Sequence, residues 1–337
     1  MYFLSTFLST LMLIALLVPG FVLRKVGLVS DTAAKDLSSV LIYIGTPAMI
    51  FYCMMSVEIE FVRPVVVLMC VLLSLAIHFI AYGLVRVAFH RSEDAGKKAA
   101  ASFSAVFSNC GFLGIPLTRI AIEYGDSFGE ASGAAISEAM LYVTIFNVVF
   151  NLLNWTLGVF LYGAAPTKKL MAKKALLNPC TVATVAALPF TLTGLSLLDP
   201  ITIGDFEITQ IGSMITYLYN ICVPVSMCIF GIRVADSSFA HMVKSKYVYV
   251  SSAVKLVIVP LITVGVCLLL NLWLDVGLPF ALAMTVMSAT PSATTALAFA
   301  ERFDGDSLLA SECVMATTLL SVVTVPLFLT LATAAIG

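Results

Sequence analysis

Apolar runs about 20 residues long follow one another along almost the whole chain, separated by short polar segments. A run of this length is what an α-helix needs to cross the hydrocarbon core of a bilayer. Of the 337 residues, 61% are hydrophobic and only 11% are charged, too few charges for the surface of a soluble domain. The sequence therefore predicts an all-α polytopic membrane protein with almost no domain outside the bilayer.

Ten transmembrane spans are predicted from these runs. They cover, in order, residues 3–23, 36–56, 64–88, 99–122, 134–162, 179–198, 210–232, 247–271, 279–299 and 308–335. When both termini lie outside the cytoplasm, 15 of the 18 Lys and Arg residues fall in cytoplasmic loops. Cytoplasmic loops carry such an excess of positive charge. Of the other three, Arg63 and Arg119 lie on the predicted outer side and Lys255 lies inside a span.

Prolines recur at matching places in the two halves of the chain. Thr46 and Pro47 in the second span correspond to a Val-Pro pair ending at Pro224 in the seventh span. Pro116 in the fourth span corresponds to Pro291 in the ninth, with nearly the same separation along the chain. The order and spacing of these pairs indicate an internal repeat.

The repeat divides the chain into three parts. We predict a first five-helix repeat over residues 1–163, a basic cytoplasmic linker over 164–178 and a second five-helix repeat over 179–337. Because five is an odd number, the second repeat must enter the membrane inverted relative to the first. Inverted repeats with paired helix breaks are typical of secondary transporters that bind their substrate near the bilayer midplane.

The fourth span contains a polar stretch that breaks helices. Between Ser108 and Pro116 it combines Asn109 with two glycines, Gly111 and Gly114. Proline has no N–H and clashes with the carbonyl four residues earlier, so a helix must kink or break there. Broken backbone is tolerated in a membrane only where protein or a hydrated cavity covers it. This stretch is therefore a candidate binding site.

The ninth span has a matching break without any charge, because Thr290, Pro291 and Ser292 lie in a run rich in hydroxyl groups. If the two breaks cross, half-helix N-termini bring partial positive charge and free N–H groups to one point, which suits a carboxylate. The amide of Asn109 could then orient the substrate, because it both donates and accepts hydrogen bonds. The alternative is that each proline merely kinks its helix.

Two basic residues are further candidates, because a charge inside a membrane costs roughly 2.5–3.5 kcal/mol and normally has a partner or a task. Arg119 either draws anions toward the break or pairs with Glu123 one turn further on. Lys255 is a candidate for coupling or gating, and the alternative is that its side chain extends to the cytoplasmic surface.

Acidic residues also occupy matching places in the two halves. Glu138 and Glu312 lie early in the fifth and tenth spans and are candidates for coupling to H⁺ or Na⁺. The alternative is that they are first-turn acids stabilised by the helix dipole. Asp126 and Asp306, each in a Gly-Asp-Ser turn, are expected to be helix caps or turn residues.

Enzymatic, metal-dependent and nucleic-acid-binding functions find no support in the sequence. There is no H-E-x-x-H or G-x-S-x-G motif, and the eight cysteines contain no C-x-x-C pair. The formal net charge of −1 gives no indication of a nucleic-acid partner. We therefore expect no catalytic residues, no metal site and no cofactor.

The string from Asn109 to Arg119, N-C-G-F-L-G-I-P-L-T-R, resembles the fourth-span signature of the auxin efflux carrier family. That family includes the plant PIN auxin exporters and bacterial permeases assigned to malate, malonate and related organic anions. The pattern has an asparagine seven residues before the proline, then G-I-P-L and a basic residue. The matching positions are Asn109, Gly114, Ile115, Pro116, Leu117 and Arg119. The short linker is similar to that of the bacterial members.

The resemblance implies a fold with a scaffold domain (spans 1, 2, 6 and 7) and a transport domain (spans 3–5 and 8–10) that moves like an elevator. The substrate carboxylate would bind beside Asn109, with Thr46, Pro47 and Pro224 as candidates on the scaffold side. It also implies a homodimer in a bacterial inner membrane.

These observations together predict a secondary transporter of small organic anions, either mono- or dicarboxylates. Two alternatives remain open. One is a Na⁺-coupled organic-anion symporter of the bile-acid type, and the other is a transport-fold sensor that binds a metabolite without moving it.

Overall fold

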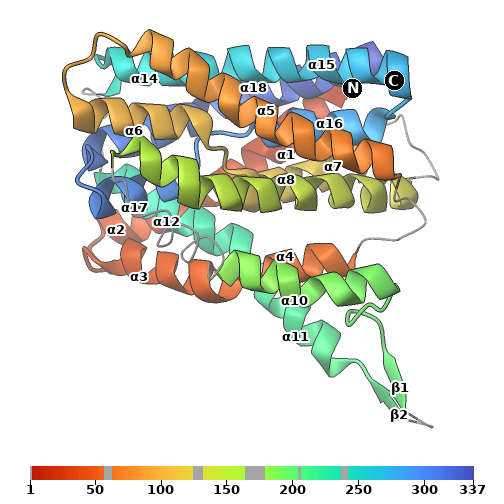
Figure 1. Cartoon of the computed structure of the whole chain (residues 1–337). Helices are drawn as coiled ribbons and strands as arrows, with labels where there is room; N and C mark the ends of the chain where they lie inside the picture. Colours follow the sequence, from red (N-terminus) through yellow and green to blue (C-terminus); the bar gives the residue numbers. More distant parts are fainter. Residues whose placement is uncertain (1, 57–62, 124–131, 164–178, 204–205, 237–241) are drawn as a thin grey trace.

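The computed structural model describes residues 2–56, 63–123, 132–163, 179–203, 206–236 and 242–337. These residues are almost entirely helical (Figure 1). Two short strands, β1 (Ile201–Ile203) and β2 (Phe206–Ile208), pair antiparallel with Ile201 opposite Ile208. They project from one end of the molecule beside α11.

The helices follow the predicted spans closely, and several spans are divided into shorter pieces. The first half contains α1 (Tyr2–Ala15), α2 (Leu17–Lys25), α3 (Ala33–Val40), the π-helical turn η1 (Leu41–Gly45), α4 (Thr46–Met55), α5 (Pro64–Ala88), α6 (Ala95–Val106), the π-helical turn η3 (Cys110–Gly114), α7 (Ile115–Glu123) and α8 (Ser132–Leu161). The second half contains α10 (Pro179–Thr193), α11 (Gln210–Asn220), α12 (Cys222–Asp236), α14 (Lys246–Ala253), the π-helical turn η5 (Val254–Ile258), α15 (Val259–Leu274), α16 (Leu278–Ala289), α17 (Thr295–Arg302) and α18 (Ser307–Ile336).

Within the described residues, 7 helical stretches are long and apolar enough to cross a membrane. They correspond to predicted spans 1, 2, 3, 5, 7, 8 and 10. The other three spans hold shorter helices, because spans 4 and 9 are each interrupted and α10 in span 6 has 15 residues. The chain is thus an all-helical, multi-pass membrane protein, and the total of ten spans stays a prediction.

Prolines lie at most of the interruptions, but not in the same way at each. Pro291 lies inside the non-helical segment between α16 and α17. Pro116, in contrast, is the second residue of α7, and the chain leaves the helix earlier, at Phe107–Asn109. The expected break at Pro116 is therefore displaced toward Asn109. A proline at the start of a helical segment is tolerated, because its missing N–H has no helical partner there.

Two glycines let α2 and α12 approach very closely. A Cβ on Gly231 would lie 1.9 Å from the carbonyl oxygen of Leu17, and a Cβ on Gly20 would lie 2.0 Å from that of Cys228. No side chain fits at such distances, so these backbones touch directly. The pair α2 and α12 is consequently one of the tightest helix contacts of the fold.

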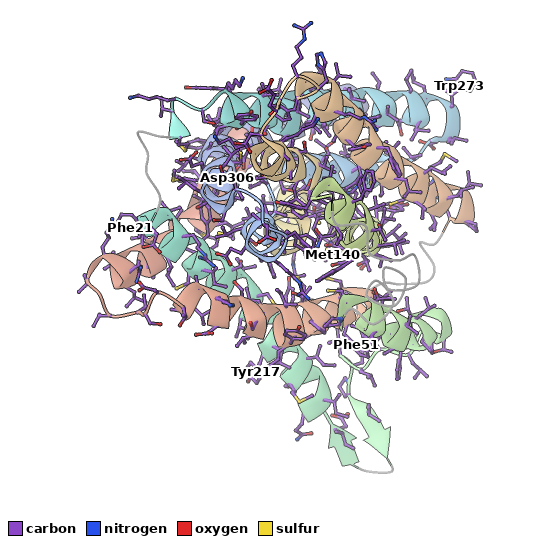
Figure 2. All side chains as sticks on the ribbon, turned by 60° about the vertical axis from the view of Figure 1, so that its left-hand side comes forward. Phe21, Phe51, Met140, Tyr217, Trp273 and Asp306 are labelled. Atoms are coloured by element: carbon purple, nitrogen blue, oxygen red, sulfur yellow. The ribbon has the colours of Figure 1, made fainter. Side chains whose placement is uncertain are left out.

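The helices form two groups on either side of α8. In Figure 1, α3, α4, α10 and α11 lie below α8, whereas α5, α14, α15 and α18 lie above it. Figure 2, seen from a different direction, keeps this separation: Phe51 of α4 and Tyr217 of α11 lie in the lower group, and Trp273 of α15 lies in the upper one. The helices α2 and α3 both pack on α12, which continues from α11.

Asp306 confirms a prediction made from its Gly-Asp-Ser turn. Its carboxylate oxygen accepts a hydrogen bond from the backbone N–H of Leu309 at 2.8 Å, so Asp306 is the N-cap of α18. The corresponding Asp126 lies outside the described residues.

Candidate functional site

The interrupted segments of spans 4 and 9 meet in the middle of the protein. The backbone N–H of Asn109 donates to the carbonyl of Pro291 at 2.7 Å. In return, the N–H of Ala293 donates to the carbonyl of Phe107 at 2.9 Å. The two non-helical segments therefore pair antiparallel, as two short strands would. This pairing satisfies backbone groups that would otherwise be unbonded inside a membrane.

Ser292 supports this pairing from behind. Its hydroxyl donates to the carbonyl of Ser104 at 2.6 Å, and its N–H donates to the hydroxyl oxygen of Thr317 at 3.1 Å. The hydroxyl of Thr290 donates to the carbonyl of Met287 in its own helix at 3.2 Å. Both side chains are fully buried. The hydroxyls of Thr290 and Ser292, predicted as substrate ligands, are thus engaged with the protein.

A cavity of about 850 Å³ lies against the paired segments. One wall comes from α3, η1, α4, the start of α10 and Arg233 of α12, and the other comes from the paired segments, η3, α8 and α17. Large apolar side chains form much of the lining. They are Ile42, Tyr43, Met49, Phe112, Phe150, Trp155 and Phe299.

Amide side chains form the polar part of the lining. Asn109 contributes one, and α8 contributes Asn147, Asn151 and Asn154. The amide of Asn147 is occupied, because its oxygen accepts from Cys110 Sγ at 3.3 Å and its nitrogen donates to Val143 at 3.1 Å. Among the described residues, none hydrogen-bonds the side chain of Asn109. Asn109 therefore offers both donor and acceptor groups to a ligand in the cavity.

Charged side chains also line the cavity. They belong to Lys35, Arg233, Glu301 and Arg302. Arg233 of α12 pairs with Glu301 of α17 at 3.5 Å, so the pair links the two walls of the cavity. The summed charge of these four side chains is positive, which favours anions near them.

The other predicted site residues have definite places in the structure. Gly111 and Thr46 line the cavity together with Asn109. Gly114 lies outside the lining, and a Cβ there would lie 2.5 Å from Met287 Cε, so this glycine permits the packing of η3 on α16. The predicted residues that do not line the cavity also include Pro116, Arg119, Lys255, Glu138, Glu312, Thr290, Pro291, Ser292, Pro47 and Pro224.

Arg119 and Glu138 make ion pairs away from the cavity. The guanidinium of Arg119, whose side chain is 48% exposed, lies 4.0 Å from Glu123, which is the pairing considered as an alternative. Glu138 accepts a hydrogen bond from Tyr142 at 2.8 Å and lies 3.4 Å from Arg63. Arg63 also donates to the carbonyl of Asp275 at 2.8 Å.

Lys255 lies behind the paired segments, not in the cavity. Its side chain is fully buried in η5, and its ammonium donates to the hydroxyl oxygen of Ser108. Ser108 itself lines the cavity and stands opposite Ser292 in the antiparallel pairing. Glu312 of α18 is also fully buried.

Several lining residues were missed by the sequence analysis. Asn147, Asn151 and Asn154 occur at i, i+4 and i+7 in an otherwise apolar span, which places them on one helix face. That spacing is a usable signal for a polar stripe facing a cavity. Ser108 carries no such signal, because only the tertiary structure brings it beside Lys255.

The fold and the site together define a membrane transporter: a multi-pass helical protein in which two interrupted spans meet beside a cavity. A family model described as "Membrane transport protein" matches residues 5–171 and 164–329. The chain belongs to this family, the auxin efflux carrier family that its fourth span resembles.

A relative of nearly equal length is known in an archaeon. A protein of Methanothermobacter thermautotrophicus described as an uncharacterized transporter is 28% identical over 327 residues, which is 96% of each chain. The similarity therefore extends over both halves of the chain.

Proposed function

We propose that the protein is a secondary transporter of small organic anions, mono- or dicarboxylates of the auxin, malate or malonate class. The observation that carries this proposal is the side chain of Asn109, which has no protein partner among the described residues and lines the cavity where η3 begins. The first N–H groups of a helix have no partner within it and carry partial positive charge. These N–H groups and the side-chain amide of Asn109 can together bind one carboxylate.

Alternating access requires two bodies that move relative to each other. The lower group of helices, with α2 and α12, comes from predicted spans 1, 2, 6 and 7, and the cavity lies between this group and the rest. This division supports a scaffold and a transport domain related by an elevator motion. The two family matches meet at residues 164–171, inside the predicted linker, which supports two five-helix repeats.

The charges around the cavity suggest an orientation. Lys35, Arg233 and Arg302 all belong to loops or helix ends that the distribution of basic residues assigns to the cytoplasm. We therefore propose a cytoplasm-facing cavity, both termini outside, in a bacterial inner membrane, and a homodimeric assembly as in the family.

The driving force follows from the charge of the substrate. Each elementary charge that crosses the membrane is worth about 2.3 kcal/mol per 100 mV, so an interior-negative potential expels an anion unaided. Import needs a co-transported H⁺ or Na⁺. Lys255 and Glu312 are the buried candidates for such coupling.

The test is flux through proteoliposomes containing the purified protein, with labelled malate, malonate and indole-3-acetate as probes and with the potential, the H⁺ gradient and the Na⁺ gradient set separately. We expect flux of at least one probe, and a loss of about tenfold or more in Asn109→Ala, because a hydrogen bond to a charged group is removed. The control is Asn220→Ala, an exposed asparagine at the end of α11.

Three other results of this experiment would change the proposal. Full flux and binding in Asn109→Ala would show that the site is assigned wrongly. Flux that requires Na⁺ would favour the bile-acid type of symporter. Binding of a probe without any flux under any gradient would favour a sensor and contradict transport.

A further inference from the structure

Two asparagine side chains of α8 turn their amide nitrogens toward their own helix. The nitrogen of Asn147 donates to the carbonyl of Val143 at 3.1 Å, and the nitrogen of Asn151 donates to the carbonyl of Asn147 at 2.8 Å. A backbone carbonyl can only accept a hydrogen bond, so these contacts fix which side of each amide is the nitrogen. The amide oxygens are therefore the groups left for partners outside α8.

The two amide oxygens differ in whether they are already bonded. The oxygen of Asn147 accepts from Cys110 Sγ at 3.3 Å. No described residue donates to the oxygen of Asn151, whose partly exposed side chain lines the cavity. Asn151 therefore presents to the cavity an acceptor whose orientation is fixed by the helix.

Asn154 adds a second acceptor on the same face of α8, three residues further on. Its side chain also lines the cavity and is only 3% exposed. Its amide oxygen is buried and has no hydrogen-bond partner among the described residues. An unsatisfied buried acceptor is unfavourable, and a donor that arrives from the cavity would offset this cost.

The surroundings of these acceptors are apolar. Phe150 and Trp155 of α8 line the cavity, and the ring of Trp155 packs on Phe299 of α17 with 5.2 Å between the centroids. A hydrogen bond is stronger beside such a wall than in water. An ionised carboxylate only accepts hydrogen bonds and cannot bond to an amide oxygen, whereas a hydroxyl group can donate to one.

We propose that Asn151 and Asn154 bind a hydroxyl group of the transported anion, so that the substrate is a hydroxy acid. The hydroxyl donates to the oxygen of Asn151, and Asn154 supplies a second acceptor beside it. Malate carries such a hydroxyl and malonate does not. This inference rests on the proposed function, and it narrows the substrate class through a contact on α8.

The test compares acids that differ by one hydroxyl group. The full-length protein in nanodiscs is titrated calorimetrically with malate and succinate, and with lactate and propionate. The wild type is expected to bind the hydroxy acid of at least one pair about tenfold more tightly than the plain acid. Asn151→Ala is expected to raise the dissociation constant of the hydroxy acid to that of the plain acid, with little change for the plain acid.

Three further variants control this comparison. Asn109→Ala is expected to weaken both acids of a pair equally, because they share the carboxylate. Thr156→Ala is expected to keep the preference, since Thr156 lies outside the cavity lining and its hydroxyl donates to the carbonyl of Leu152 at 2.8 Å. Should Asn151→Ala not fold, Asn151→Leu replaces it with the same expectation, because leucine has a similar volume and no polar atom.

The outcomes separate this inference from the proposed function. Equal binding of the two acids of each pair by the wild type overturns the inference and leaves the proposed function standing. Binding of malonate or indole-3-acetate without either hydroxy acid has the same meaning. Equal weakening of both acids by Asn151→Ala also overturns the inference, since that is the effect of a structural role or of a co-ion site. If the wild type binds none of these acids, the proposed function fails and this inference with it.

Discussion

At the scale of single residues, the role of a polar side chain in this protein depends on whether its hydrogen-bonding groups are already bonded to other groups of the protein. Asn109 keeps donor and acceptor groups for the cavity, whereas the hydroxyls of Thr290 and Ser292 are already bonded within the protein. Residue type alone does not distinguish these cases, because an amide or a hydroxyl can hydrogen-bond either a ligand or the protein. The free donors are therefore the better candidates for contact with the substrate.

Glu138 illustrates the same distinction for a carboxylate. It accepts from Tyr142 and pairs with Arg63, which also bonds the carbonyls of Asp275 and Val276. These contacts tie the start of α5 to α8 and to the turn before α16. They favour a structural role over the coupling role considered from the sequence.

We predict that Glu138→Gln lowers the thermal midpoint of the purified protein by a few degrees and leaves the ion dependence of flux unchanged. The physical reason is that an exposed or half-exposed ion pair contributes about 1 kcal/mol or less. The measurement is thermal unfolding together with flux at separate H⁺ and Na⁺ gradients. A change in which ion drives flux would restore Glu138 as a coupling residue.

At the scale of elements, the breaks in spans 4 and 9 are stabilised by each other. The carbonyl of Phe107 and the N–H of Asn109 would be unbonded in either span alone, and they find partners at Ala293 and Pro291. Neither interrupted helix is therefore stable in lipid by itself. The close packing of α2 on α12 is a second case, in which two glycines replace side chains with backbone contact.

We predict that Gly231→Ala destabilises the protein by about 1–3 kcal/mol or more, because its Cβ overlaps the backbone of Leu17 and forces α2 and α12 apart. The measurement is unfolding in mixed micelles. Gly83→Ala is the control, since a Cβ at Gly83 in α5 meets nothing within 4 Å. It is expected to be neutral or slightly stabilising, because alanine is the better helix former. Equal effects of the two substitutions would contradict the packing argument.

At the scale of the whole molecule, the asymmetry of basic residues predicts how the protein sits in the membrane. A fusion of alkaline phosphatase after Gly337 is expected to be active, because the C-terminus would lie in the oxidising periplasm, and a fusion of green fluorescent protein there is expected to be dark. Fusions ending at Thr167, at the start of the predicted cytoplasmic linker, are the control and should give the opposite pair of signals. The same signals at both positions would contradict the predicted topology.

The sequence by itself determined the class of this protein and the location of its interrupted spans. Apolar runs long enough to span a bilayer exclude a soluble fold for this chain, and the cluster of Asn109, Gly111, Gly114 and Pro116 disfavours a regular helix in the fourth span. Local chemistry suffices for these conclusions.

Only the tertiary structure decided which groups face the cavity. Ser108 and Lys255 are far apart in sequence, and so are Arg233 and Glu301; each pair meets because separate helices pack together. Whether a polar group is free or already bonded depends on that packing, which no single segment contains.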